Sequence, residues 1–212
     1  MRTDLPPNVT ESNAGEAPRP REQRTVTTLL LGRVLGGERG DGLCRVRNLS
    51  AGGMMFEAHR RFAPGDRITV ELRNGKWLEG NVAWAQDGRH GVAFDEALSD
   101  EALTSLDKVA LASKGRARAP RFDAMLPAQA NVDGRTVPVM LENISQSGAM
   151  LRLVDPSALA NTMILTIPQL GPRLCERRWV RGDAVGVSFA QVLKYDDFAQ
   201  WLELRPVRGT PN

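Results

Sequence analysis

The chain has 212 residues, 42% of them hydrophobic and 25% charged, and 28 lysines and arginines against 25 aspartates and glutamates give it a formal net charge of +3. This composition is typical of a globular protein with one domain or two small ones, and no apolar run is long enough for a transmembrane helix or a secretory signal. Two cysteines and two histidines are too few for a zinc site or for acid–base catalysis, so we expect a cytoplasmic protein that is not an enzyme, with no metal ion and no cofactor.

The N-terminal segment, residues 1–18, is polar and contains Pro6-Pro7 but few apolar side chains, which predicts a disordered tail. Three arginines follow at Arg19, Arg21 and Arg24. Clustered guanidinium groups usually face an anion such as a phosphate, although charge on a solvated linker gives the same pattern. An anion-binding arm and an inert linker therefore both stay open for this segment.

A series of short strands is predicted between residues 29 and 94. Apolar residues recur at every second position, as at Ile68 and Val70, and glycine-containing turns separate the runs. The same alternation is expected to place Trp84 in the core rather than on the surface as a stacking platform. Ser99 is suited to cap a helix whose apolar face would close one end of a small barrel.

A basic linker, predicted over residues 112–120, contains Arg116 and Arg118 and leads to Arg121. The pattern of short alternating strands then repeats. It ends in a helix that Asp196 is expected to cap, with apolar residues at helical spacing behind it. The second half of the chain therefore predicts the same kind of barrel as the first.

An internal repeat relates the two halves. Arg24 and Arg121 lie 97 residues apart, and Trp179, like Trp84, is expected in the core. Three further features share an offset of 95 residues: Asn48–Gly53 with Asn143–Gly148, both reading Asn-x-Ser-x-x-Gly, Trp84 with Trp179, and Gly91–Phe94 with Gly186–Phe189. The repeat indicates duplication of a unit of roughly 90 to 95 residues, a normal size for a small domain.

Together these features resemble the PilZ domain: arginines before the first strand, an Asn-x-Ser-x-x-Gly segment, a strand with tryptophan and a Gly-Val-x-Phe strand. The resemblance covers Arg19 to about Leu111 and Arg116 to about Leu204. It implies a bacterial protein with a mostly β fold, two small six-stranded PilZ-type β-barrels in tandem, each with a C-terminal helix. The expected domains are a disordered tail (1–18), a first PilZ-like domain (19–111), a basic linker or arm (112–120), a second PilZ-like domain (121–205) and a tail (206–212).

Many PilZ domains bind the second messenger cyclic di-GMP, so the resemblance implies this ligand and no catalytic residues. Arginine presents a fork of donors that matches phosphate oxygens and the O6/N7 edge of guanine, which fits such a ligand. Arginines on a flexible arm would grip the ligand, and the Asn-x-Ser-x-x-Gly segment would form the half of the site on the barrel. The ligand-binding residues implied are Arg19, Arg21, Arg24, Asn48, Ser50 and Gly53, and Arg116, Arg118, Arg121, Asn143, Ser145 and Gly148.

The basic motif of the family is Arg-x-x-x-Arg, whereas Pro20 and Ala117 take the first position when Arg24 and Arg121 take the second. Two functions therefore stay open. One is a cyclic di-GMP sensor or effector that acts on an unidentified protein partner when its arginine arm becomes ordered. The other is a PilZ adaptor that binds protein partners without nucleotide, its Asn, Ser and Gly residues only holding a turn. The 5% aromatic content disfavours a third reading, a nucleic-acid-binding barrel.

Overall fold

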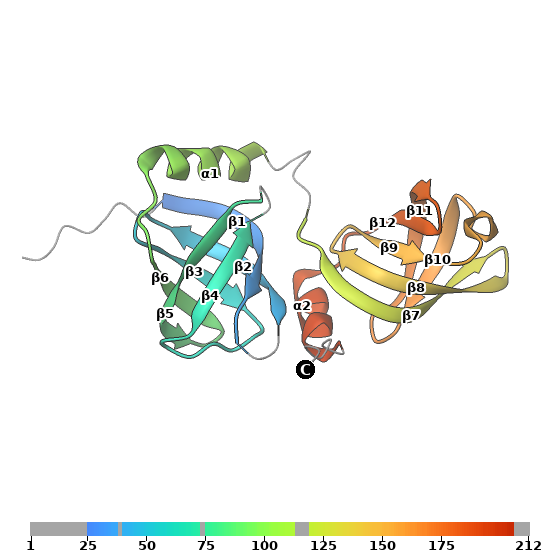
Figure 1. Cartoon of the computed structure of the whole chain (residues 1–212), viewed down its shortest axis with the longest axis horizontal. Coiled ribbons are helices and arrows are strands. Elements are labelled where there is room, and N and C mark those ends of the chain that lie inside the picture. Colours follow the sequence, from blue (N-terminus) through green and yellow to red (C-terminus); the bar gives the residue numbers. More distant parts are fainter. Residues whose placement is uncertain (1–24, 38–39, 73–74, 113–118, 206–212) are drawn as a thin grey trace, which may run out of the picture.

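Two closed β-barrels, each of six antiparallel strands, follow one another along the chain (Figure 1). The computed structural model describes residues 25–37, 40–72, 75–112 and 119–205. Around the first barrel the strands lie in the order β1-β2-β3-β6-β5-β4. Its elements are β1 (Thr25–Leu35), β2 (Asp41–Leu49), β3 (Gly53–Ala58), β4 (Arg67–Leu72), β5 (Trp77–Gln86), β6 (Arg89–Phe94) and helix α1 (Asp100–Ala112).

The second barrel has the corresponding strand order, β7-β8-β9-β12-β11-β10. The predicted fold class, two six-stranded barrels in tandem with a helix after each, is confirmed. None of the helices in the described residues has the length and apolar character that a membrane crossing requires. The elements of the second barrel are β7 (Phe122–Val132), β8 (Arg135–Ser145), β9 (Gly148–Arg152), the short 3-10 helix η1 (Pro156–Ala158), β10 (Thr162–Ile167), β11 (Gly171–Arg181), β12 (Ala184–Phe189) and helix α2 (Tyr195–Leu204).

The two barrels share irregularities as well as strand order. The pairing of β2 with β3 slips by one residue just before Asn48, and that of β8 with β9 slips just before Asn143. A second slip precedes Trp84 in β5, and its counterpart precedes Trp179 in β11. A β-bulge of this kind interrupts the alternation of side chains between the two faces. The offset of 95 residues therefore relates equivalent bulges as well as equivalent residues.

The two C-terminal helices begin differently. Ser99 caps α1 as predicted, because its Oγ accepts a hydrogen bond of 3.2 Å from the backbone N–H of Ala102. The prediction that Asp196 caps α2 is wrong: the cap position is Lys194, the helix already begins at Tyr195, and no side chain caps it. The carboxylate of Asp196 instead lies 3.3 Å from the ring of His59 in the first barrel.

Helix α2 lies between the barrels (Figure 1) and contacts both. Its buried face, Phe198, Ala199, Trp201 and Leu202, belongs to the core of the second barrel. Its first residue contacts the first barrel: the Tyr195 hydroxyl donates a hydrogen bond of 3.0 Å to the carbonyl oxygen of Glu57. The guanidinium of Arg45 lies 4.0 Å from the centre of the Tyr195 ring. The helix that closes one barrel is thus also the element on which the other barrel docks.

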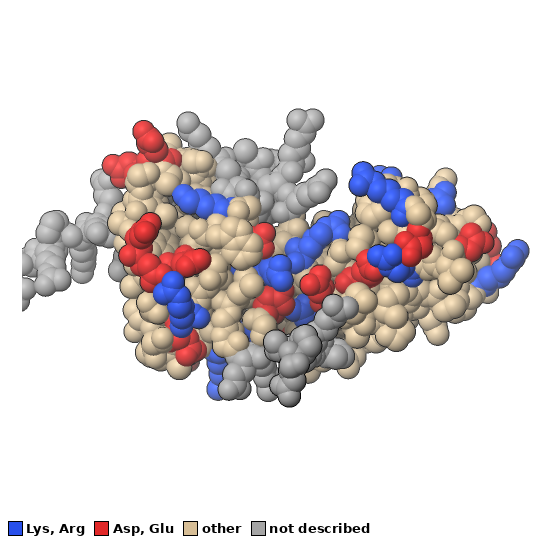
Figure 2. All heavy atoms as spheres, viewed as in Figure 1, with Lys and Arg blue, Asp and Glu red and all other residues tan. Residues whose placement is uncertain are grey.

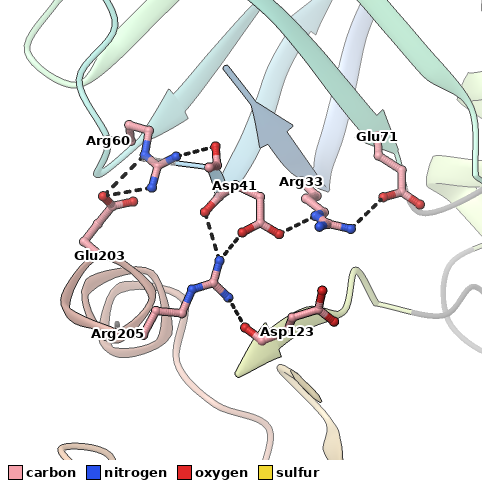
Figure 3. A network of polar contacts seen from close by, with 8 residues as sticks. Arg33, Asp41, Arg60, Glu71, Asp123, Glu203 and Arg205 are labelled. Atoms are coloured by element: carbon pink, nitrogen blue, oxygen red, sulfur yellow. Dashed lines mark hydrogen bonds and ion pairs between the residues drawn. The ribbon is translucent and has the colours of Figure 1, made fainter. Parts of the chain in front are cut away.

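A partly buried polar network joins the barrels beside α2 (Figure 3). Arg205 donates hydrogen bonds to the carboxylate of Asp41 in the first barrel and, at 2.8 Å, to the carbonyl oxygen of Asp123 in the second. Arg33 binds the other oxygen of Asp41 at 2.5 Å. Arg60 donates to the Gly40 carbonyl at 2.6 Å and lies 3.4 Å from the Glu203 carboxylate on α2. We call Arg33, Asp41, Arg60, Glu203 and Arg205 the inter-barrel clasp.

Acidification is expected to destabilise the first barrel through His90. This residue on β6 is buried, its ring stacks on Phe56, and its Nε2 accepts a hydrogen bond from the backbone N–H of Phe62. Burial lowers the pKa of His90 below its ordinary 6.5. The unfolded chain therefore binds a proton at this histidine more readily than the folded one. The contribution of neutral His90 to the free energy of unfolding is complete above pH 6.5 and decreases as the pH drops below that value.

Thermal melting at pH 7.5 and pH 5.5 measures this effect. We expect a lower melting temperature at pH 5.5 in the parent protein and a smaller drop in His90→Gln, since glutamine does not titrate. An equal drop in the two proteins would assign the pH dependence to other groups.

Candidate functional site

The Asn-x-Ser-x-x-Gly segments lie on the outer faces of the barrels, each beside a hollow of about 310 Å³. In the first barrel, the register aligns Asn48 of β2 with Met55 of β3, and Met55 with Gly91 of β6. The second barrel aligns Asn143, Met150 and Gly186 in the same way. The first hollow is lined by, among others, Asn48, Ser50, Gly53, Met55, Trp84 and Gly91, and the second by Ala119, Arg121, Ser145, Ser147, Trp179 and Arg181.

Both tryptophans lie on the outer surface, so the prediction that they are core residues is wrong. The exposed fraction is 43% for Trp84 and 36% for Trp179. The bulge before each tryptophan shifts the alternation by one position and turns the side chain outward. A Cβ on Gly91 would lie 2.0 Å from the Trp84 indole, and one on Gly186 would lie 2.1 Å from that of Trp179. Each indole therefore rests directly on a glycine of the neighbouring strand, which leaves an aromatic platform beside the hollow.

The serines and glycines of the two segments hold the turns between strands. The Ser50 hydroxyl donates a hydrogen bond of 3.1 Å to the Gly53 carbonyl, and the Ser145 hydroxyl donates one of 3.2 Å to the Gly148 carbonyl. A Cβ on either glycine would lie 2.2 Å from a carbonyl oxygen of the adjacent strand. The barrel itself therefore requires these four residues, and they shape the rim of each hollow.

Arg121 is the predicted arginine that lies within the described residues, and it lines the hollow of the second barrel. It directly precedes β7, is exposed, and its Nη1 donates a hydrogen bond of 2.7 Å to the Asn143 side-chain oxygen. The two residues stand 22 positions apart in the chain, and the pairing of β7 with β8 brings them together. The other predicted arginines, Arg19, Arg21, Arg24, Arg116 and Arg118, lie outside the described residues, as do the predicted tails.

Sequence reasoning missed Arg181 as a site residue. Its guanidinium lies 5.6 Å from the centre of the Trp179 ring, on the same hollow as Arg121. Basic side chains also gather where β11 and β12 lie, at the top of the second barrel (Figure 2). A strand glycine that recurs 95 residues on, as Gly91 and Gly186 do, could have revealed the platforms, because such glycines often mark a close approach.

A larger cavity, of about 630 Å³, lies between the first barrel and the start of α2. It contains none of the predicted site residues, and its charged side chains include pairs such as His59 with Asp196 and Arg45 with Glu57. Within the described ranges, no three His, Cys, Asp or Glu side chains are grouped so that they could hold a metal ion. The smaller hollow of the second barrel instead combines an aromatic face with two guanidinium groups, and one of them, Arg121, binds the side-chain amide of Asn143. This set of groups is suited to a planar base with an attached phosphate.

The comparison with family models agrees with the two barrels in tandem. The model described as PilZ domain matches residues 18–110 and again residues 115–202. The chain belongs to the PilZ domain family. Both of its barrels are accordingly PilZ domains, each matched over its strands and much of its terminal helix.

The solved structures that this chain is similar to include the following three. PlzA of Borreliella burgdorferi, in complex with c-di-GMP, is 11% identical, with 87% of this chain and 94% of that chain covered and a TM-score of 0.38. The inhibitor of motility MotI of Bacillus subtilis is 13% identical, with coverages of 84% and 95% and a TM-score of 0.34. YcgR of Escherichia coli, in complex with c-di-GMP, is 12% identical, with coverages of 82% and 81% and a TM-score of 0.29. A comparison with curated proteins finds no match.

Proposed function

We propose that this tandem PilZ protein is a cyclic di-GMP effector and that Arg121, Asn143 and Trp179 form the core of its nucleotide site. The observation that supports this most is the contact of Arg121 with Asn143 beside an exposed indole. Trp179 and Arg121 offer a guanine nucleotide a stacking surface and a bidentate donor in one hollow, and Asn143 adds an amide that binds Arg121. Many PilZ domains bind cyclic di-GMP, so the ligand proposed agrees with the family.

The binding mode follows from the chemistry of each group. A guanine base stacks on the indole of Trp179, which is worth about 1–3 kcal/mol for a base on an aromatic ring. Arg121 donates to the O6/N7 edge of the base or to a phosphate, and a hydrogen bond to a charged group contributes about 1.5–3 kcal/mol. Arg181, beside the same indole, adds positive charge toward the phosphates.

The proposed output is an interaction with a protein partner. Arg116 and Arg118 precede Arg121 in the chain, so a ligand held by Arg121 lies within reach of them. Charge-assisted hydrogen bonds to phosphate would order this arm, against a cost of about 1–2 kcal/mol per residue ordered. A partner that binds only the ordered arm would then sense the level of the messenger.

One observation favours the alternative, an adaptor that binds protein without nucleotide. The Ser145 hydroxyl and the missing side chain of Gly148 already have structural roles in the turn. A PilZ domain that had lost its ligand would keep both residues for that reason.

Isothermal titration of the full chain with cyclic di-GMP tests the proposal. We expect saturable binding to the parent and about 10- to 100-fold weaker binding at the second barrel for Arg121→Ala and for Trp179→Ala. Arg178→Ala is the matched control, because Arg178 lies beside Trp179 in β11 but binds Ser188 and Glu176. It should bind like the parent.

If the folded protein gives no heat of binding at millimolar ligand, the proposal is wrong and the alternative, an adaptor that binds protein without nucleotide, is favoured. Binding of arbitrary single-stranded DNA with a steep salt dependence would instead indicate a nucleic-acid partner.

A further inference from the structure

An unusual charge cluster lies on the outer face of the first barrel, where three arginines surround one glutamate. The Arg47 Nη2 donates to the Glu57 carboxylate at 2.7 Å, and nitrogens of Arg45 and Arg89 lie 3.8 Å and 3.6 Å from it. One carboxylate therefore faces three guanidinium groups, which leaves two positive charges in excess. We call these four residues the Glu57 cluster.

Two other exposed arginines of the described surface show the opposite balance. Arg67 lies within reach of two carboxylates, those of Glu79 and Asp95. Arg152 likewise binds both Glu142 and Asp183. The Glu57 cluster, with three guanidinium groups around one carboxylate, differs from both of these arrangements.

The second barrel shows that the fold does not need this cluster. At the offset of 95 residues, Arg45 corresponds to Met140, Arg47 to Glu142, Glu57 to Arg152 and Arg89 to Ala184. The central charge is reversed there, and three arginines are replaced by one acidic and two neutral side chains. The same strands nevertheless form a closed barrel. The excess charge in the first barrel therefore has a cause other than folding.

The cluster lies on the same strands as the hollow of the first barrel, although none of its four residues lines that hollow. Glu57 follows Met55 by two positions on β3, and Arg89 precedes Gly91 by two positions on β6, with Met55 and Gly91 both lining the hollow. Two residues along a strand span about 7 Å. A ligand seated against Trp84 would therefore extend to the guanidinium groups.

One donor in the cluster lacks a partner. The Nε of Arg47 is buried and makes no hydrogen bond with the described atoms. Buried donors in folded proteins are almost always paired, so an unpaired one calls for an acceptor that none of the described residues supplies. Arg45 stacks on Tyr195, whereas the side chain of Arg89 is 61% exposed and is the most accessible of the three.

We infer that the Glu57 cluster is a phosphate subsite of the first barrel, where Arg47 and Arg89 bind a phosphodiester group of a nucleotide seated on Trp84. This rests on the proposed function for the identity of the nucleotide. The second barrel has no equivalent subsite, so the two barrels hold their ligands by different means. The first relies on charge at the far end of the hollow, and the second on Arg121 and Arg181 around the indole.

The test isolates the first site. In full-length Arg121→Ala/Trp179→Ala, which lacks the second site, cyclic di-GMP is titrated with and without Arg89→Ala. We expect Arg89→Ala to weaken binding about 10-fold and to flatten its dependence on NaCl concentration, because one charge contact is lost. Arg67→Ala is the matched control: its side chain is also 61% exposed in the same barrel, and it should change neither.

Each result is informative. A 10-fold loss confined to Arg89→Ala, with an unchanged melting temperature, supports the subsite. Equal affinities for Arg89→Ala and Arg67→Ala would overturn it while leaving the proposed function in place. Binding by the parent but not by Arg121→Ala/Trp179→Ala would also overturn the subsite, because it would restrict the ligand to the second barrel. Absence of binding in the parent would remove both proposals.

Discussion

Replacing Asp41 with alanine is expected to destabilise the docked barrels by about 3–5 kcal/mol. Asp41 is the carboxylate of the inter-barrel clasp, and it accepts from both Arg205 and Arg33 (Figure 3). The side chain of Arg205 is only 7% exposed. Without Asp41 its guanidinium would remain buried with backbone carbonyl partners but no counter-charge, which is far more costly than losing a surface ion pair.

Urea unfolding followed by tryptophan fluorescence measures this loss as a lower midpoint. Small-angle X-ray scattering below that midpoint should also report a larger radius of gyration, as the barrels separate. Asp183→Ala is the control, since Asp183 is 51% exposed in its pair with Arg152, and the expected loss is below about 1 kcal/mol. Equal midpoints for the two variants would show that the clasp does not hold the barrels together.

Gly148→Ala is expected to destabilise the second barrel by about 3 kcal/mol and to abolish ligand binding there with it. The added Cβ would lie 2.2 Å from the carbonyl oxygen of Val187 on β12. That oxygen belongs to the backbone of a paired strand, so it cannot move aside as the end of a flexible side chain would. The strands must separate locally, and the Ser145 hydrogen bond to Gly148 would be lost with them.

Gly134→Ala provides the comparison within the same barrel. Gly134 has a positive φ of 80° in a hairpin turn, with no atom within 4 Å of an added Cβ, so the expected cost is only about 1 kcal/mol of backbone strain. Chemical denaturation and titration with cyclic di-GMP should be measured on both variants. A stable Gly148→Ala protein that fails to bind would contradict this account, because the glycine would then act on the ligand rather than on the fold.

Much of the architecture could be predicted from local patterns. Alternation at positions such as Ile68 and Val70 predicted strands, and both side chains are buried in β4. The repeat of Asn48 as Asn143 predicted equivalent positions in two barrels, which the matching bulges bear out. These signals survive in the sequence because a strand records its buried face in every second residue.

The errors arose where a prediction depended on strand pairing. Trp84 was assigned to the core by the same alternation, but a bulge in the pairing of β5 with β6 turns it outward. A bulge is defined by the partner strand, so a single strand read alone does not reveal it. The prediction that Asp196 caps α2 was wrong because of another tertiary contact: the Asp196 carboxylate lies beside His59, which is 137 residues away in the chain.

The class of fold, the duplication and the Asn-x-Ser-x-x-Gly segments can be read from the sequence, since each depends on residues that are near one another in the chain or repeat at a constant offset. Which side chains meet depends on the folded arrangement. It brought Arg121 to Asn143, laid Trp179 on Gly186, and joined Asp41 to Arg205 across 164 positions. Contacts of that kind come from closing the sheets and docking the barrels, and no local pattern of polarity encodes them.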